Sequence, residues 1–243
     1  MLKNHVEQER PGEEELGRRL EEARKRLGAL QMQIKEHGLP VLVLMEGWGT
    51  AGKGSTIGKI IRNIDPRFFK VATMAAPTEE ELRKPFLYRY FARIPEAGKF
   101  TFLDSGWMDE ITGDVLQGTP EDEGYSSRIY RIKRFERQLT DNGYLVMQFF
   151  FHIDEKEQRK RLDALLVNKD TSWRVSDSDR WQNKHYDKCL KVFDRYLDDP
   201  NVSTAPWYIV DAHSRKWAQL QVLEMLFQGI DVALKKKSFA VPL

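Results

Sequence analysis

The chain is poor in cysteine, in long apolar runs and in charge of one sign. Its one cysteine, Cys189, excludes an internal disulfide and a metal site built from several thiolates within one chain. The longest apolar runs, Val41–Met45 and Tyr144–Phe151, are far shorter than the ~20 residues that a membrane-spanning helix needs. Because 39 basic residues nearly balance 37 acidic ones, a general nucleic-acid-binding protein is disfavoured. Residues 1–15 lack the apolar core of a secretory signal, so the sequence predicts a cytoplasmic protein without membrane or nucleic-acid partners.

What the chain does contain is enough apolar material for a large core. Its 243 residues are 41% hydrophobic and 11% aromatic, and they fit one large domain at roughly 150 residues per domain. We divide the chain into a leader with an N-terminal helix (1–38), a main domain (39–236) and a tail or start of a linker (237–243). Residues from about 168 to 200 are polar, carry two tryptophans and show no strand pattern, which is typical of an exposed excursion or a lid.

An apolar stripe predicts a helix within the first forty residues. Its members recur at alternating spacings of four and three: Leu16, Leu20, Ala23, Leu27, Leu30 and Ile34. Gly38 is suited to end this helix. Two interpretations stay open, an amphipathic helix that lies on the domain and a dimerising helix. The first is favoured because a sustained coiled coil needs more heptads than these two.

From Pro40 onward, short apolar runs alternate with helical periodicity. The expected strands are 41–45, 70–74, 100–103, 144–151 and 207–210. The expected helices are about 53–63, 79–93, 125–142, 155–168 and 214–234. Several strands are apolar on both faces, as in a parallel sheet that helices cover on both sides. The pattern therefore predicts an α/β three-layer sandwich around a central parallel sheet of about five strands.

The strongest functional signal is a glycine-rich loop that follows the first expected strand and opens a helix. It predicts phosphate binding by Gly47, Gly49, Thr50, Ala51, Gly52, Lys53, Gly54, Ser55 and Thr56. The glycines allow a tight turn that directs backbone N–H groups at one anion, and the helix N-terminus adds further donors. Lys53 supplies a mobile charge for the outer phosphates. The usual pattern has Ser or Thr directly after the lysine, whereas Gly54 intervenes in this chain.

A second signal is an aspartate at the end of the third expected strand. Enzymes with a phosphate-binding loop place a carboxylate that holds Mg²⁺ at such a position, so Asp104 is a candidate metal ligand and catalytic residue. A cap of the strand end is the alternative role. His152 and Asp154 also follow a strand, but no third ligand lies near them in sequence, and we interpret both as structural.

Arginines and lysines are frequent in the region that should cover the loop. They are Arg67, Arg89, Arg93, Arg134, Arg159, Lys160 and Arg161. Arginine suits bidentate contacts to phosphate, and a long polyanion needs several cations along a groove. Any single one of these side chains is more often a solvated surface residue. We retain Arg67 and Arg93 as candidate phosphate ligands.

Taken in order, these motifs resemble the family-2 polyphosphate kinases from about Gly12 to Leu234. The matching stretches are 46–54, 64–67, 76–81, 93–95, 135–139 with Gly143, and 205–210. The resemblance implies a P-loop kinase-like fold similar to thymidylate kinase, with a helical lid at about 168–200. It implies phosphoryl transfer between inorganic polyphosphate and AMP or ADP/ATP with Mg²⁺ as cofactor, and catalytic roles for Lys53 and Asp104. It also implies a homo-oligomer or a fused or associated second polyphosphate-kinase domain.

The chain departs from the family pattern at three positions. The family usually carries Asp at Gly49, and two arginines where this chain has Ser105 and Glu110. We expect Glu110 to repel a phosphate chain, while Asp109 and Asp114 are candidates to restore a metal-binding carboxylate. The pattern resembles the degenerate N-terminal domain of two-domain polyphosphate:AMP phosphotransferases. Two functions therefore stay open, a polyphosphate-dependent phosphotransferase and a catalytically degenerate module that binds polyanion and supports a partner domain or oligomer.

Overall fold

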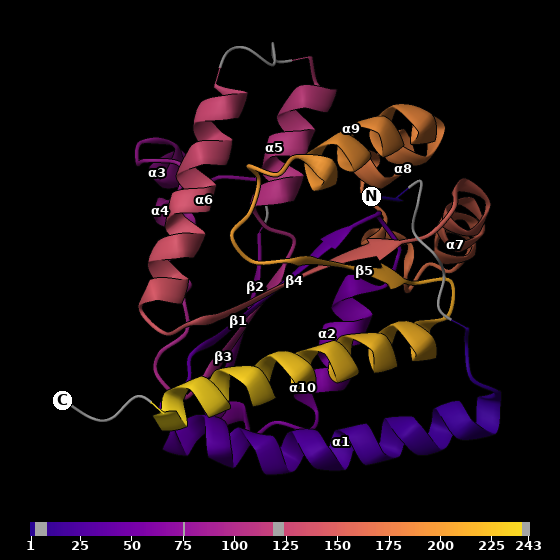
Figure 1. Cartoon of the computed structure of the whole chain (residues 1–243). Helices are drawn as coiled ribbons and strands as arrows, with labels where there is room; N and C mark the ends of the chain where they lie inside the picture. Colours follow the sequence, from indigo (N-terminus) through magenta and orange to yellow (C-terminus); the bar gives the residue numbers. More distant parts are fainter. Residues whose placement is uncertain (3–8, 75, 119–123, 240–243) are drawn as a thin grey trace.

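The computed structural model describes residues 1–2, 9–74, 76–118 and 124–239. Its centre is a five-stranded parallel sheet in the order β2-β3-β1-β4-β5 (Figure 1). The strands are β1 (Val41–Gly47), β2 (Phe69–Thr73), β3 (Phe100–Asp104), β4 (Leu145–His152) and β5 (Trp207–Asp211). All five lie within a residue or two of the expected positions. The predicted α/β fold with a parallel sheet of about five strands is confirmed.

The burial of each strand follows its place in the sheet. The interior strands β1, β3 and β4 are buried on both faces over nearly their whole length, which explains why their sequences are continuous apolar runs. The edge strand β2 leaves Lys70 and Val71 exposed. Since β1 and β3 pair in parallel with Met45 opposite Asp104, both strands end at the same edge of the sheet. That edge carries the glycine-rich loop.

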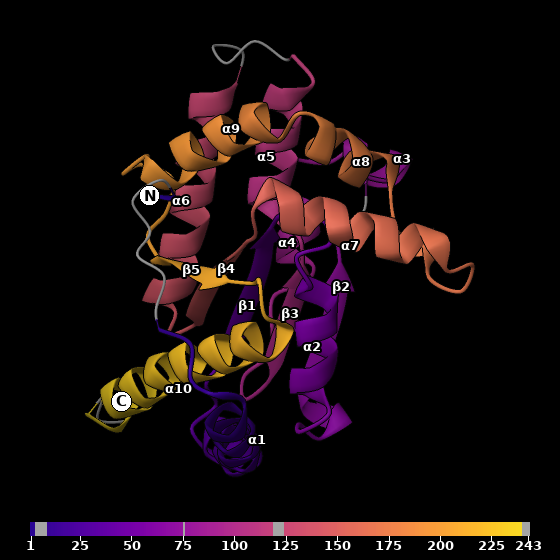
Figure 2. The same ribbon diagram turned by 90° about the vertical axis from the view of Figure 1, so that its right-hand side faces the viewer.

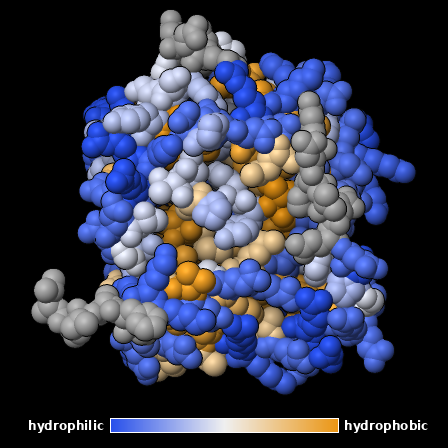
Figure 3. Space-filling view, viewed as in Figure 1, coloured by the Kyte–Doolittle hydropathy of each residue, from blue (hydrophilic) through white to orange (hydrophobic). Residues whose placement is uncertain are grey.

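Helices cover both faces of the sheet and complete the three-layer sandwich (Figures 1 and 2). One face carries α2 (Lys53–Ile61) and α10 (Arg215–Phe239), with α1 (Glu13–Glu36) outside α10. The other face carries α5 (Trp107–Leu116) and α6 (Tyr125–Asp141), with α9 (Tyr186–Asp198) packed on α5. In Figure 3 the surface is largely hydrophilic, and apolar side chains gather at its centre, where the edge strand β5 lies.

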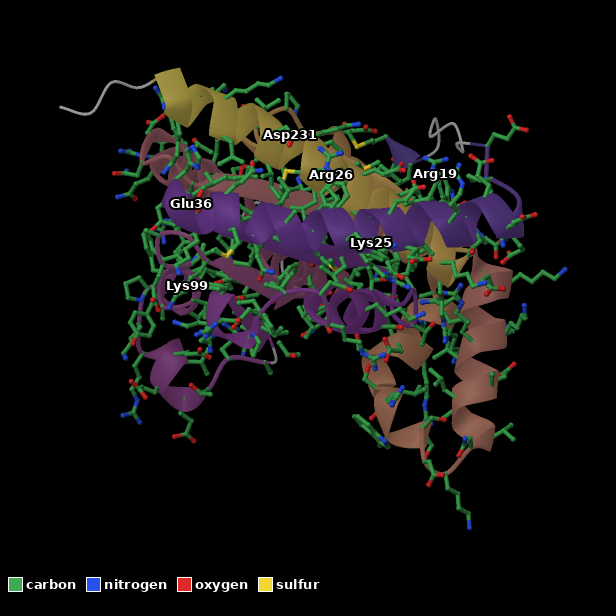
Figure 4. The ribbon with its side chains drawn as sticks, turned by 90° about the horizontal axis from the view of Figure 1, so that it is seen from below. Arg19, Lys25, Arg26, Glu36, Lys99 and Asp231 are labelled. Atoms are coloured by element: carbon green, nitrogen blue, oxygen red, sulfur yellow. The ribbon has the colours of Figure 1, made fainter. Side chains whose placement is uncertain are left out.

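The apolar stripe of the N-terminal helix is used within the chain. All six stripe residues of α1 are buried, and α1 lies alongside α10. Ion pairs flank the contact, with Arg19 2.6 Å from Glu224 and Arg26 2.5 Å from Asp231; Figure 4 shows Arg26 and Asp231 between the two helices. The amphipathic helix that lies on the domain is therefore the arrangement observed. The dimerising alternative required this apolar face of α1 to be free, and it is instead buried within the chain.

Two helix predictions need correction. The single helix expected over 79–93 is two short helices, α3 (Glu79–Leu82) and α4 (Tyr88–Phe91). Pro85 lies between them, and proline lacks the N–H and disfavours helical geometry in the residue before it. The sequence analysis also missed α5, which is separated from β3 by two residues and buries Trp107, Met108 and Ile111. Its apolar positions fill barely three turns, which leaves little periodicity to detect.

The expected lid is more deeply packed than its polar sequence suggests. Residues 168–200 contain η3 (Ser172–Arg174), α8 (Asp177–Lys184) and α9. Helix α9 buries Cys189, Phe193 and Tyr196, so this part of the segment belongs to the core. Residues 168–170, Trp173, Arg174 and the start of α8 have the exposed character expected, with Trp173 75% exposed.

The C-terminal helix is longer than expected. Helix α10 continues to Phe239, beyond the expected end at 234 and into the segment 237–243 assigned to a tail. Residues 240–243 lie outside the described part of the chain. Among the described residues, no helix combines the length and the apolar character that a bilayer crossing requires.

Candidate phosphate-binding site

The glycine-rich loop connects β1 to α2 at the carboxyl edge of the sheet, where α/β proteins commonly bind ligands. Gly47 has φ +112°, and a Cβ there would lie 2.5 Å from the carbonyl oxygen of Phe151, so only glycine allows this approach to β4. Gly52 has φ +104° and forms the N-cap of α2. Thr50 has φ +61°, an unusual value for a β-branched residue. Within the loop, the amide of Trp48 donates to the carbonyl oxygen of Phe151 and the amide of Ala51 donates to that of Trp48, each at 3.2 Å.

Lys53 folds back over the loop that precedes it. Its Nζ donates to the carbonyl oxygens of Gly47 at 3.0 Å and Trp48 at 3.1 Å. The ammonium therefore rests at the turn formed by residues 47–49. A cation at this point can neutralise an outer phosphate held by the loop amides. Ser55 is exposed and Thr56 is buried in the first turn of α2.

Aromatic stacking fixes the loop to the lid segment. The indole of Trp48 is fully buried and stacks on Tyr186 of α9, with ring centroids 4.0 Å apart and planes inclined by 8°. Its Nε1 donates to Nδ1 of His152 at 3.1 Å. His152 is therefore a structural acceptor, as interpreted from the sequence. Asp154 accepts from the N–H of Glu157 and caps α7 (Glu155–Val167).

Arg161, one of the candidate cations, braces the back of the loop. From α7 its guanidinium donates to the carbonyl oxygens of Thr50 at 3.3 Å and Ala51 at 3.0 Å. It also donates to Ala212 at 2.7 Å, just beyond β5. The side chain is 7% exposed. These bonds occupy the donors of Arg161, so it holds the loop in shape and does not face a phosphate.

Helix α8 contacts the loop at Gly49. Gln182 accepts from the Gly49 N–H at 2.8 Å, and Gln158 of α7 donates to the Gly49 carbonyl at 3.3 Å. Gln158 also donates to Gln182 at 3.0 Å and accepts from Asn183 at 3.1 Å. A Cβ at Gly49 would overlap the Oδ1 of Asp179. The sequence analysis did not find this contact, because the two partners are 133 residues apart.

Three carboxyl groups lie close enough to Lys53 to interact with it electrostatically. Burial raises the pKa of Asp104, at the end of β3, and the Lys53 charge opposes this rise. Burial likewise raises the pKa of Asp109, on the first turn of α5. Burial and the Asp109 charge together raise the pKa of Glu46 to about 8. Glu46 accepts from the N–H of Met108 at 3.1 Å, so it anchors the start of α5.

These residues fit a magnesium ion that arrives with its phosphate ligands. The described part of the chain has no group of three or more His, Cys, Asp or Glu side chains arranged to hold a metal. Mg²⁺ is commonly bound through one or two carboxylates, with substrate phosphates and waters as the other ligands. Asp104 can supply a carboxylate at the loop, since its Oδ2 lies 2.9 Å from the position of a Cβ on Gly54.

The structure does not bring Arg67 to the loop, which corrects that prediction. Arg67 lies in η2 (Pro66–Phe68), just before β2, and its side chain is 80% exposed and pairs with Asp65 at 2.8 Å. Because the strands are parallel, the start of β2 is at the edge opposite the loop. Arg93 follows α4 and donates to Glu81 at 3.1 Å and to the carbonyl of Arg89 at 2.6 Å. Among the described residues, the hydrogen-bond and ion-pair partners of its guanidinium are therefore Glu81 and Arg89, not the loop.

Glu110 is enclosed by cationic and hydroxyl groups. It accepts from the hydroxyl of Tyr90 at 2.7 Å and from Arg128 at 3.1 Å, and it lies 3.5 Å from Arg89. Arg128 also pairs with Asp114. The expectation that Glu110 repels a phosphate chain therefore overlooked its neutralisation by these arginines. Asp114 is likewise engaged with Arg128, and of the two candidate carboxylates Asp109 is the one that interacts electrostatically with Lys53.

Comparisons with known proteins show the family to which the chain belongs. The family model for polyphosphate kinase 2 (PPK2) matches residues 11–238. The chain belongs to this family. A polyphosphate:AMP phosphotransferase from Pseudomonas aeruginosa is 31% identical over 220 residues, which cover 90% of this chain and 44% of that protein. An AMP/ADP-polyphosphate phosphotransferase from Meiothermus ruber is 27% identical, covering 85% of this chain and 79% of the relative.

The fold of this PPK2-family chain is also that of solved structures. A crystal structure assigned to polyphosphate kinase 2 from Pseudomonas aeruginosa superimposes with a TM-score of 0.88 at 24% identity. The superposition covers 97% of this chain and 50% of that one. The chain likewise spans less than half the length of two polyphosphate:AMP phosphotransferases that it matches, 44% of the one from Pseudomonas aeruginosa and 39% of the one from Pseudomonas syringae.

Proposed function

We propose that this PPK2-family chain binds inorganic polyphosphate on the loop 47–56 and moves a phosphoryl group between it and a nucleoside mono- or diphosphate. The observation that carries the proposal is the position of Lys53. Its ammonium rests on the first turn of the loop and interacts with Asp104 and Asp109. The names of the relatives, which act on AMP, ADP and polyphosphate, supply the substrate class.

In this reaction the protein contributes mainly by positioning the substrates and neutralising their charge. The loop amides and the N-terminus of α2 would hold the outer phosphates, and Lys53 would neutralise part of their charge. Asp104 would hold Mg²⁺, which when bound neutralises phosphate oxygens. The phosphate oxygen of the acceptor nucleotide is already ionised at neutral pH, so no side chain has to act as a base. Burial keeps Glu46 protonated at that pH, which limits the negative charge around the phosphates.

A second candidate function is a catalytically degenerate module that binds polyanion and supports a partner domain or an oligomer. Three observations favour it. No arginine stands at Ser105 or Glu110, Glu110 occupies Arg89 and Arg128, and α8 contacts the loop at Gly49. A missing cation near the transferring phosphate reduces the rate by ~10³-fold or more. A second copy or a second polyphosphate-kinase domain as partner, and a cytoplasmic location, belong to this proposal as predictions.

Transfer assays with the 243-residue chain distinguish the two functions. Polyphosphate, Mg²⁺ and either AMP or ADP are mixed with wild type, Lys53→Ala or Lys59→Ala, and the new nucleotide is quantified. Lys59 lies at the other end of α2 and is the matched control. Turnover that disappears only in Lys53→Ala establishes the phosphotransferase. A folded chain that binds polyphosphate through Lys53 without turnover is the degenerate module, and binding unaffected by Lys53→Ala contradicts the proposed site.

A further inference from the structure

Helix α8 holds the glycine-rich loop by a hydrogen bond that a ligand could also use. The oxygen of the Gln182 amide accepts from the Gly49 N–H at 2.8 Å. This N–H is one of the backbone donors of the loop, and Lys53 rests on the neighbouring carbonyl of Trp48. A backbone N–H has a single hydrogen to donate. This N–H can therefore donate either to an outer phosphate or to the Gln182 amide, but not to both.

The contact belongs to a network of buried amide side chains from α7 and α8. Gln158 is fully buried, Gln182 is 8% exposed and Asn183 is 5% exposed. Gln158 bonds to both of the others and to the carbonyl of Gly49. Asn183 also donates to the carbonyl of Glu155 at 3.1 Å, which ties α8 to the start of α7. A connected amide network of this kind fixes one geometry, because a buried amide that loses its partner is costly.

The absence of a side chain at Gly49 is what allows α8 to dock. A Cβ at Gly49 would overlap the Oδ1 of Asp179. The other oxygen of Asp179 accepts from the N–H and the hydroxyl of Ser176, each at 2.8 Å, in the capping box of α8. Asp179 is therefore held by its own helix and cannot swing away freely. A side chain at this position would therefore require Asp179, at the start of α8, to move away from the loop.

We propose that Gln182 is a displaceable occupant of the phosphate-binding loop. Its amide oxygen and an outer phosphate compete for the Gly49 N–H. Phosphate binding and the release of α8 from the loop are therefore coupled. Glycine at position 49 makes this competition possible, because it leaves room for α8 to contact the loop. The docking of α8 on the loop is inferred only from its contacts with Gly49. The identity of the competing anion, the outer phosphate of a polyphosphate chain, rests on the proposed function.

Two variants release α8 by different routes. Gln182→Ala removes the competing acceptor, and Gly49→Ala keeps the N–H but overlaps Asp179. Gln138→Ala, on the exposed face of α6, is the matched control. Amide hydrogen exchange of residues 47–52 is measured without ligand, and the affinity for tripolyphosphate is measured by calorimetry. A neutral hydrogen bond is sufficient to shift such an equilibrium about fivefold.

We expect faster exchange in the loop for Gln182→Ala and Gly49→Ala, together with roughly fivefold tighter tripolyphosphate binding by Gln182→Ala, and no change in Gln138→Ala. Faster exchange with unchanged or weaker binding would show that Gln182 only braces the loop and would overturn the proposal. Unchanged exchange in both variants overturns the docking itself. If neither wild type nor Gln182→Ala binds tripolyphosphate while exchange responds as expected, docking stands, but the competition and the proposed phosphate site both fail. If Gln182→Ala does not fold, Gly49→Ala carries the same exchange test.

Discussion

Two strand-to-helix turns lie side by side at the carboxyl edge of the sheet, and they differ in what they present. The turn from β1 to α2 presents backbone amides and Lys53, whereas the turn from β3 to α5 presents the carboxylates of Asp104 and Asp109. Each contains one non-glycine residue with positive φ, Thr50 at +61° and Ser105 at +65°. The two turns therefore share a positive-φ residue but present different groups, backbone amides and an ammonium in one and carboxylates in the other.

In the second turn, the negative charge of Glu110 is compensated by several neighbouring side chains together. Where the family pattern has arginine, Glu110 receives hydrogen bonds from Tyr90 and Arg128 and lies near Arg89. Arg89 is only 5% exposed, so its charge needs a partner inside the protein. Arginine at this position would therefore change more than one residue, because it removes an acid shared by both arginines and leaves Arg89 with Glu81 and Arg128 with Asp114.

The largest expected effect is that of Glu110→Arg. It replaces the shared carboxylate with a third guanidinium beside Arg89 and Arg128. Removing one partner of a buried ion pair costs roughly 3–5 kcal/mol, and since Glu110 is 20% exposed we expect a loss of about 3 kcal/mol. Urea denaturation at neutral pH measures this loss.

A matched charge reversal separates this effect from net charge. Glu36→Arg, at the exposed end of α1, should change the stability by no more than about 0.5 kcal/mol. Glu110→Gln should lie between the two, because it keeps a hydrogen-bond acceptor for Tyr90. Equal stability of Glu110→Arg and wild type would mean that the ion-pair cluster contributes little, and that the family arginine can be restored freely.

The sequence predicted the elements whose signals are local. The five strands, the loop with its glycines and Asp104 at a strand end each follow from fewer than a dozen neighbouring residues. Contacts between distant residues left no such signal: Gly49 meets Gln182 across 133 positions, and Arg161 meets Ala51 across 110. Arg67 was misplaced for the same reason, since which edge of the sheet a residue occupies depends on strand direction. The role of Glu46 was missed because its burial is a tertiary property.

An effect that depends on pH is expected at Glu46, which joins the two turns. The pKa of Glu46 rises from 4.5 to about 8 in the folded chain, so the folded state keeps a proton that the unfolded state releases. Stability from this group is complete below pH 4.5 and falls as the pH rises toward 8, by about 1.4 kcal/mol per pH unit. Glu46→Gln should remove this slope and still accept from Met108.

The comparison requires stability measurements of both proteins at several values between pH 5 and 8. Glu136, whose pKa burial raises to about 7, contributes a similar slope below pH 7 and remains in the variant. The difference between the two curves therefore isolates Glu46. The free energy of unfolding of Glu46→Gln, relative to that of wild type, should increase steadily as the pH rises. Parallel curves would mean that Glu46 is ionised in the folded chain and that the charge around Lys53 is more negative than proposed.

The smallest effect tests the feature that the two turns share. A non-glycine residue in the left-handed region costs roughly 1–2 kcal/mol, and glycine returns part of that through the entropy of the unfolded chain. Thr50→Gly and Ser105→Gly should thus each stabilise by about 0.5 kcal/mol. Thr50→Gly should gain up to about 1 kcal/mol more, because the Thr50 hydroxyl is buried without a hydrogen-bond partner among the described residues. Urea denaturation ranks the two variants, and a loss of stability in Thr50→Gly alone would indicate that the threonine side chain packs favourably enough to outweigh its backbone strain.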